Sequence, residues 1–161
     1  MVLLLLASGF LAPTAVWLKW GKAMYTAADG SFELHMLICS ALLALTLPIL
    51  QIGLHIRRFG GSVIRSNRDF YPTAKGAAAR VARAHANAIE SLAPFAVVIL
   101  SAHALSVSNR WTIAASALFF VARVMHSLTY VLGIRVIRSS AFYAAWIATA
   151  AIALNVLHHG R

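Results

Sequence analysis

Long apolar runs separated by short polar segments dominate the pattern of this chain. Four runs, near residues 33–56, 84–107, 111–134 and 139–157, are long enough at 1.5 Å per residue to cross a hydrocarbon core of about 30 Å. They show no regular alternation of polar and apolar residues, and each is about twice the length of a strand in a membrane barrel. The pattern therefore predicts an all-α fold, an integral membrane bundle of four helices.

A fifth apolar run, residues 2–18, is short for a membrane span and contains Pro13. Lys19 and Lys22 follow this run and no basic residue precedes it, whereas a secretory signal peptide begins with basic residues. We expect residues 1–32 to form a peripheral or membrane-embedded apolar extension of the four-helix domain at residues 33–161. An extra span, an uncleaved anchor or a misassigned start codon are the alternatives.

Composition agrees with a membrane protein, since 61% of the 161 residues are hydrophobic and 11% are charged. The formal net charge of +10 gathers in the long connection at residues 57–83 and in the short link around Arg135 and Arg138. Both connections lie on one side of a four-span bundle, so the positive-inside rule places them in the cytoplasm. These arginines fit contact with anionic membrane lipids or attraction of a charged ligand, and no aromatic interleaving indicates a nucleic-acid groove.

Polar side chains are spaced at helical intervals inside the second run. Arg83, Asn87 and Glu90 follow the spacing i, i+4, i+7, which puts them on one helix face, with Arg80 at its edge. A carboxylate at membrane depth costs several kcal/mol, so such a residue usually faces a protein interior and has a function there. A guanidinium, an amide and a carboxylate on one face indicate a site for a small, charged, peptide-like ligand.

A second polar stripe lies in the third run, where Arg123, His126 and Tyr130 follow the spacing i, i+3, i+7. Both stripes approach the predicted cytoplasmic end, so we expect a pocket between the helices at that depth. The stripes could instead join helices, with Glu90 paired to Arg123 or Arg80 and with His126 bonded to a carbonyl. No metal site is predicted.

These residues carry a family resemblance. Residues 80–95, RVARAHANAIESLAPF, closely resemble the second-helix signature of the membrane-associated proteins in eicosanoid and glutathione metabolism, the MAPEG family. Residues 123–130, RVMHSLTY, and 137–142, IRSSAF, resemble the third and fourth helices of that family. The resemblance covers roughly residues 33–157.

The resemblance implies a homotrimer of four-helix protomers that binds glutathione, as a co-substrate, between neighbouring subunits and towards the cytoplasm. It also implies roles for particular residues. Arg138 would be the catalytic arginine beside the thiol, with Ser139 next to it. Glutathione would be held by matching motif positions, which are Arg57, Arg83, Asn87, Glu90, His126 and Tyr130.

Glutathione chemistry suits this set of side chains. Arginines bind its carboxylates bidentately, and Glu90 can take its ammonium group or orient an arginine. A guanidinium beside the thiol favours the reactive thiolate. The second substrate would be a lipophilic small molecule dissolved in the bilayer, either an electrophile that is conjugated or a lipid hydroperoxide that is reduced.

Some positions depart from the family pattern. Phe142 stands where some members have tyrosine, and Tyr143 follows one residue later. Arg135 could take the role assigned to Arg138. Some relatives are non-catalytic scaffolding or lipid-binding proteins. A small multidrug transporter that uses Glu90 is a further alternative, although arginines on the same stripe would suppress cation binding.

Overall fold

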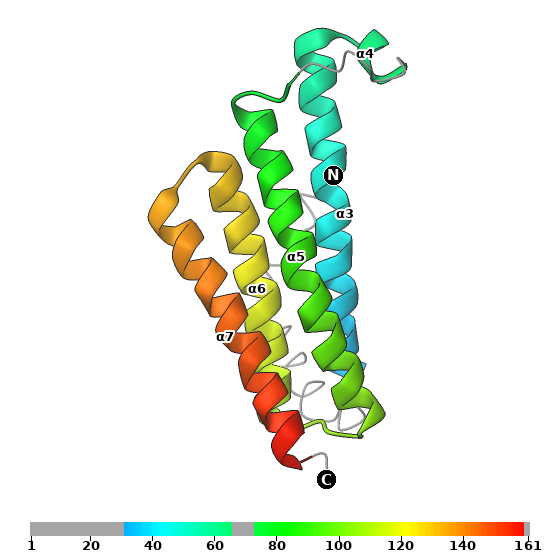
Figure 1. Ribbon diagram of the computed structural model, residues 1–161, viewed down its shortest axis with the longest axis vertical. Coiled ribbons are helices and arrows are strands. Elements are labelled where there is room, and N and C mark those ends of the chain that lie inside the picture. The colour runs from blue at the N-terminus through cyan, green and yellow to red at the C-terminus, as the bar shows by residue number, and fades with distance from the viewer. Residues whose placement is uncertain (1–30, 66–72, 160–161) are drawn as a thin grey trace, which may run out of the picture.

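The computed structural model describes residues 31–65 and 73–159, and these residues form helices joined by short links. Four long helices are present, α3 (Ser31–Phe59), α5 (Ala77–Ala104), α6 (Arg110–Leu132) and α7 (Arg135–His159), with the single-turn helix α4 (Ser62–Arg65) after α3. Each long helix has the length and apolar composition needed to cross a membrane. The predicted all-α fold with four candidate spans is therefore confirmed (Figure 1). The apolar run at residues 2–18 lies outside the described residues.

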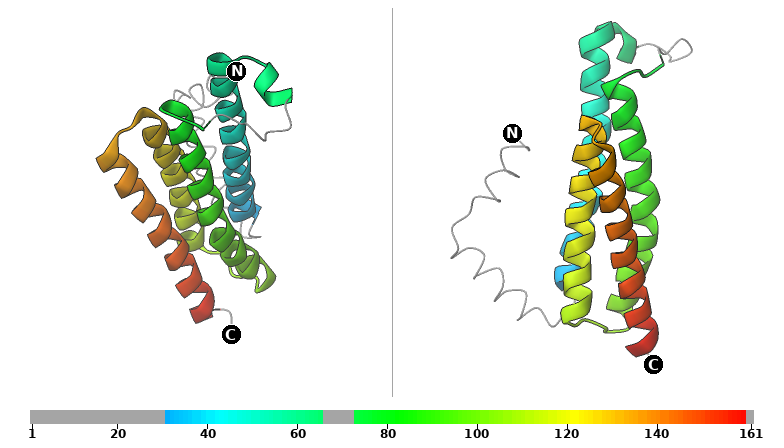
Figure 2. Two further views of the ribbon diagram at one scale, coloured as in Figure 1. Left: turned by 45° about the horizontal axis from the view of Figure 1, so that its top comes forward. Right: turned by 90° about the vertical axis from the view of Figure 1, so that its left-hand side faces the viewer.

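The four long helices lie side by side, in the order α7, α6, α5 and α3 across Figure 1. The most extensive contact joins α6 to α7, and α3 packs mainly on α5. One end of the bundle holds helix α4, the last turn of α3, the start of α5 and the α6–α7 link. We call it the basic end. At this end α3 projects beyond the α6–α7 link in both views of Figure 2. The described cationic residues of the basic end are Arg57, Arg58, Arg65, Lys75, Arg80, Arg83, Arg135 and Arg138.

The link between α6 and α7 is shorter than the sequence predicted. Gly133 has a φ of 84°, a conformation open to glycine, and it ends α6. The N–H of Ile134 donates to the Thr129 carbonyl at 2.9 Å, and α7 begins at once with Arg135. The predicted link around residues 134–138 is therefore wrong, because Arg138 lies in the first turns of α7. The Arg138 side chain therefore projects from α7, the helix that packs along α6.

The interior is built from small and aromatic side chains. Phe95 of α5 and Phe119 of α6 are fully buried and stacked, with ring centroids 3.6 Å apart. Between α3 and α5 the buried residues include Ala44, Ala84 and Ala88. In lipid, helices associate through close van der Waals packing, which small residues permit.

A polar network joins three helices at the end opposite the basic end. The Glu33 carboxylate is buried and accepts hydrogen bonds from the hydroxyls of Thr112 at 2.6 Å and Ser108 at 2.9 Å. Asn109 caps the start of α6 through its side chain and donates to the Asn155 side chain of α7 at 2.8 Å. The network fixes the starts of α3 and α6 and the end of α7 relative to one another.

Candidate functional site

The α5 stripe lies at the border between the interior and the surface of the protomer. Asn87 is half-buried, whereas Arg83 and Glu90 are exposed. The expected interior position of Glu90 is therefore not found within one protomer. Its alternative pairing with Arg80 or Arg123 is not seen among the described residues either. Arg80 instead donates from Nε to the Val131 carbonyl at 2.8 Å, which satisfies one of the last carbonyls of α6.

The α6 stripe, in contrast, lies inside the protomer. Arg123 and His126 are 2% and 3% exposed. Arg123 donates from Nη2 to the Asn87 side-chain oxygen at 2.9 Å. His126 Nδ1 donates to the Arg138 carbonyl at 3.0 Å, so the expected carbonyl partner for this histidine is present. These two bonds attach α6 to α5 and to the start of α7.

Tyr130 is the point where the two stripes and α7 meet. The guanidinium of Arg138 lies 4.8 Å from the centre of its ring, and that of Arg83 lies 6.0 Å away. The His126 ring contacts Tyr130 edge-on at 5.4 Å between centroids. We call Arg83, His126, Tyr130 and Arg138 the tyrosine cluster. Two cations share one aromatic ring there, and neither has a carboxylate partner in the described parts of the chain, so the cluster is suited to bind an anion.

Arg138 and Arg135 differ in their surroundings, although both lie at the start of α7. Arg138 is half-buried and sits on Tyr130, whereas Arg135 is exposed. The geometry thus brings Arg138 to the cluster and leaves Arg135 outside it. Ser139 is exposed and its hydroxyl donates to the Arg135 carbonyl at 3.2 Å, within its own helix.

The remaining predicted residues lie at other places. Arg57 is exposed in the last turn of α3, the helix that projects past the α6–α7 link, and no contact joins it to the tyrosine cluster among the described residues. Phe142 lies 6.0 Å from the His126 ring, between centroids. Tyr143 contacts Phe142 edge-on but is 63% exposed, so it points away from the cluster.

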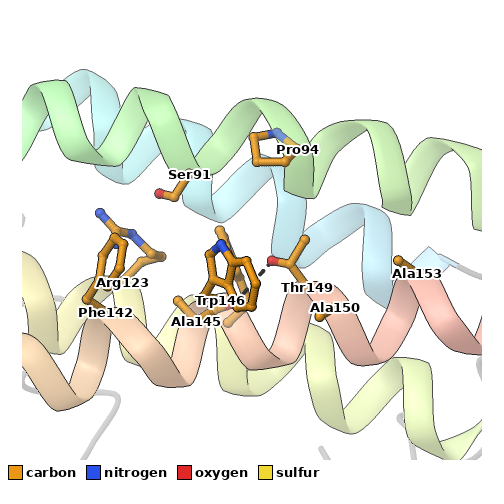
Figure 3. A pocket seen from close by; sticks show the side chains of 10 residues that line it. Ser91, Pro94, Arg123, Phe142, Ala145, Trp146, Thr149, Ala150 and Ala153 are labelled. Carbon is orange, nitrogen blue, oxygen red and sulfur yellow. Dashed lines mark hydrogen bonds between the residues drawn. The ribbon is translucent and has the colours of Figure 1, made fainter.

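A pocket that sequence reasoning missed lies between α5, α6 and α7 (Figure 3). Its volume is about 220 Å³, and it extends along α7 from Arg123 and Phe142 at one end to Ala153 at the other. Pro94 of α5 is among the residues that line it. The sequence does contain a sign of this pocket, a row of residues on one face of α7 in which small side chains predominate. The row consists of Phe142, Ala145, Trp146, Thr149, Ala150 and Ala153.

The family comparison covers this whole region. The family model of the MAPEG family matches residues 36–158, a range that contains the tyrosine cluster and the pocket. No curated protein matches the chain.

Proposed function

The chain belongs to the MAPEG family, and we propose that it is a membrane-embedded enzyme that uses glutathione. The family includes glutathione transferases, peroxidases and members without catalytic activity. The proposed reaction is conjugation of a lipophilic electrophile or reduction of a lipid hydroperoxide.

The observation that supports this proposal best is the pair of guanidiniums on Tyr130. Arg83 and Arg138 come from different helices, converge on one ring and have no acidic partner among the described residues. Glutathione carries two carboxylates, which such donors bind through charge-assisted hydrogen bonds. Asn87 and Glu90, on the same stripe as Arg83, would add an amide and an acceptor for the ammonium group.

Arg138 and Ser139 would then have different roles in the reaction. Arg138 is held in place because its carbonyl accepts from buried His126 while its guanidinium rests on Tyr130. A cation fixed in this way favours the charged form of a nearby thiol. Glutathione supplies the thiolate that attacks the lipophilic acceptor. Ser139 is next to Arg138 in the sequence, but its hydroxyl donates to a carbonyl within α7, so we expect it to contribute less to catalysis than Arg138.

Assembly into a homotrimer would complete the site. Arg83 and Glu90 are exposed on α5 in one protomer, and Arg57 lies apart from the cluster on α3. An exposed carboxylate on a spanning helix is costly against lipid, and a neighbouring copy that covers this face would remove that cost. Arg57 of one copy would then reach the cluster of the next, with the basic end in the cytoplasm as the positive-inside rule favours.

Glutathione binding to the detergent-purified protein tests the proposal. Calorimetry would give the affinity, and an ultraviolet scan of the same sample would show a thiolate band. We expect saturable binding with a thiolate band that Arg138→Ala removes and Arg135→Ala keeps, since the two arginines start the same helix but only Arg138 contacts Tyr130. No binding at millimolar glutathione would refute the proposal.

A non-catalytic lipid-binding protein is the second candidate, and the apolar pocket along α7 is the observation that favours it. Such a protein would bind lipid without binding glutathione. The transporter alternative has less support, because Glu90 shares its stripe with Arg83 and lies outside the protomer interior.

A further inference from the structure

The end of α3 and the connection that follows it carry exposed cations without an acidic partner among the described residues. Arg58 lies in the last turn of α3, Arg65 ends α4 and Lys75 lies shortly before α5, and all three side chains are exposed. We call these three residues the tip cations. The described acidic residues lie elsewhere, Glu33 at the opposite end of the bundle and Glu90 in the middle of α5. Unpaired like charges at one end of a protein repel one another, so the tip favours an anionic partner.

The lengths of the helices place the tip at the depth of lipid headgroups. Glu33 and Thr112 are hydrogen-bonded at 2.6 Å, so α3 and α6 start at one level. From this level α6 extends about 30 Å to Leu132, which is the thickness of a hydrocarbon core. Over the same direction α3 extends about 38 Å from Glu33 to Arg58, and it projects beyond the α6–α7 link in Figure 2. Arg58 therefore lies at the outer edge of the headgroup layer, within reach of lipid phosphates.

Apolar side chains beside the tip cations indicate a lipid as the partner, in preference to a dissolved anion. Ile56 and Phe59 are exposed in the last turns of α3, and the Arg58 guanidinium lies 5.4 Å from the centre of the Phe59 ring. Aromatic rings at a membrane interface contact the acyl region, while long cationic side chains beside them extend to the headgroups. One phospholipid offers both partners, an acyl chain to Ile56 and Phe59 and a phosphate to Arg58.

We propose that the tip cations bind the headgroups of anionic phospholipids in the membrane leaflet at the basic end. Phosphate oxygens would accept charge-assisted hydrogen bonds from the guanidiniums and from the Lys75 ammonium group. A single lysine or arginine near an anionic membrane surface strengthens association about fivefold. The surface leaves out Arg57, which the proposed function assigns to glutathione, so this proposal does not depend on glutathione binding.

Native mass spectrometry of the detergent-purified full chain tests this proposal. Dioleoyl phosphatidylglycerol and dioleoyl phosphatidylcholine would be added at equal concentration, and we expect the anionic lipid to bind at least tenfold more tightly. Glycerol 3-phosphate carries the phosphate without acyl chains, so it should displace phosphatidylglycerol only at concentrations at least tenfold higher than those of the lipid. Equal binding of the two lipids would overturn the proposal, and so would equally effective displacement by glycerol 3-phosphate.

Arg110 provides a matched control for Arg58. Each is an exposed arginine whose guanidinium lies over the ring of the next residue, at 6.0 Å from Trp111 and at 5.4 Å from Phe59, but Arg110 lies at the opposite end of the bundle. Arg58→Gln should weaken phosphatidylglycerol binding about fivefold, whereas Arg110→Gln should leave it unchanged within about twofold. Equal losses in the two variants would refute the assigned surface.

Two further variants separate charge from fold. Arg58→Lys keeps the positive charge and should retain phosphatidylglycerol binding, and a loss as large as that of Arg58→Gln would contradict an electrostatic surface. The combined variant Arg58→Gln, Arg65→Gln, Lys75→Gln should bind phosphatidylglycerol no more tightly than phosphatidylcholine. Retained selectivity for the anionic lipid in this variant would overturn the proposal.

Glutathione affinity measured on Arg58→Gln keeps the two proposals separate. If the lipid proposal alone fails, the two lipids bind alike while the wild type still binds glutathione. If the glutathione proposal alone fails, neither protein binds glutathione, yet phosphatidylglycerol binding still depends on Arg58. Displacement of phosphatidylglycerol by millimolar glutathione would show that the tip cations attract glutathione instead, and it would overturn the lipid proposal.

Discussion

Replacing Tyr130 by leucine should weaken glutathione binding through the loss of an aromatic surface, without removing any charge. The Tyr130 ring contacts the guanidiniums of Arg83 and Arg138, which the proposed function makes the main anion-binding groups. Leucine keeps an apolar side chain at this place but lacks the negative face of a ring. Both arginines would remain in the protein and lose the surface that orients them.

The expected magnitude follows from the two contacts. Cation–π interactions contribute about 0.5–1 kcal/mol at exposed sites and about 2 kcal/mol when desolvated. Arg83 is exposed and lies 6.0 Å from the ring centre, so it contributes about 0.5–1 kcal/mol. Arg138 is half-buried and lies at 4.8 Å, so it contributes about 1–2 kcal/mol. The sum of about 1.5–3 kcal/mol sets the upper limit of the loss, a decrease in glutathione affinity of about 10- to 150-fold.

Calorimetric titration of wild type, Tyr130→Leu and Tyr130→Phe would measure this effect. Phenylalanine keeps the ring and removes only the hydroxyl, so we expect it to bind glutathione with an affinity close to that of the wild type. If Tyr130→Phe lost as much affinity as Tyr130→Leu, the hydroxyl would hold the ligand and the ring argument would be refuted. If neither variant lost affinity, the tyrosine cluster would not be the binding site.

Three further predictions concern other contacts. Arg138→Ala should abolish turnover even at saturating glutathione, because the thiol then lacks its cation, whereas Glu90→Ala should weaken glutathione affinity and keep turnover at saturation; equal turnover of the two variants at saturating glutathione would remove this division of roles. Arg80→Met should accelerate amide hydrogen exchange at the end of α6, because the Val131 carbonyl loses its donor, and unchanged exchange would contradict the capping role. Thr112→Val should lower the melting temperature by about 3–12 °C, from the loss of a hydrogen bond to a buried carboxylate worth about 1.5–3 kcal/mol, whereas Thr112→Ser should retain most of it; equal melting temperatures for the two variants would contradict this account.

Periodicity was enough to predict which residues share a helix face. The four spans and the two polar stripes follow directly from the spacing of apolar and polar residues, and the structure has helices at all four places. Helix ends were predicted less well. α5 begins at Ala77, ahead of the predicted span, because Arg80 and Arg83 continue the helix beyond the apolar run. An apolar run marks the part of a helix that is in lipid, and the helix itself can be longer.

Periodicity does not say what a helix face packs against. Glu90 and Arg123 both looked like interior residues, because each is a charge within an apolar run. The structure buries Arg123 against Asn87 and leaves Glu90 on the outside of the protomer. The pocket was missed for the same reason, since the alanines of α7 line a space only where α5 and α6 stand beside them. These facts depend on the tertiary arrangement of three helices.

The link of Gly133 and Ile134 between α6 and α7 also affects how the chain enters a membrane. α6 carries Arg123 and His126 near its middle, and an arginine at the centre of an inserting helix costs about 2.5–3.5 kcal/mol on insertion scales. α7 supplies the carbonyl that accepts from His126, and it contributes more contact to α6 than any other helix. A link of two residues is too short for one helix to enter the membrane while the other stays in the translocon. We therefore expect the two helices to leave the translocon together as a hairpin.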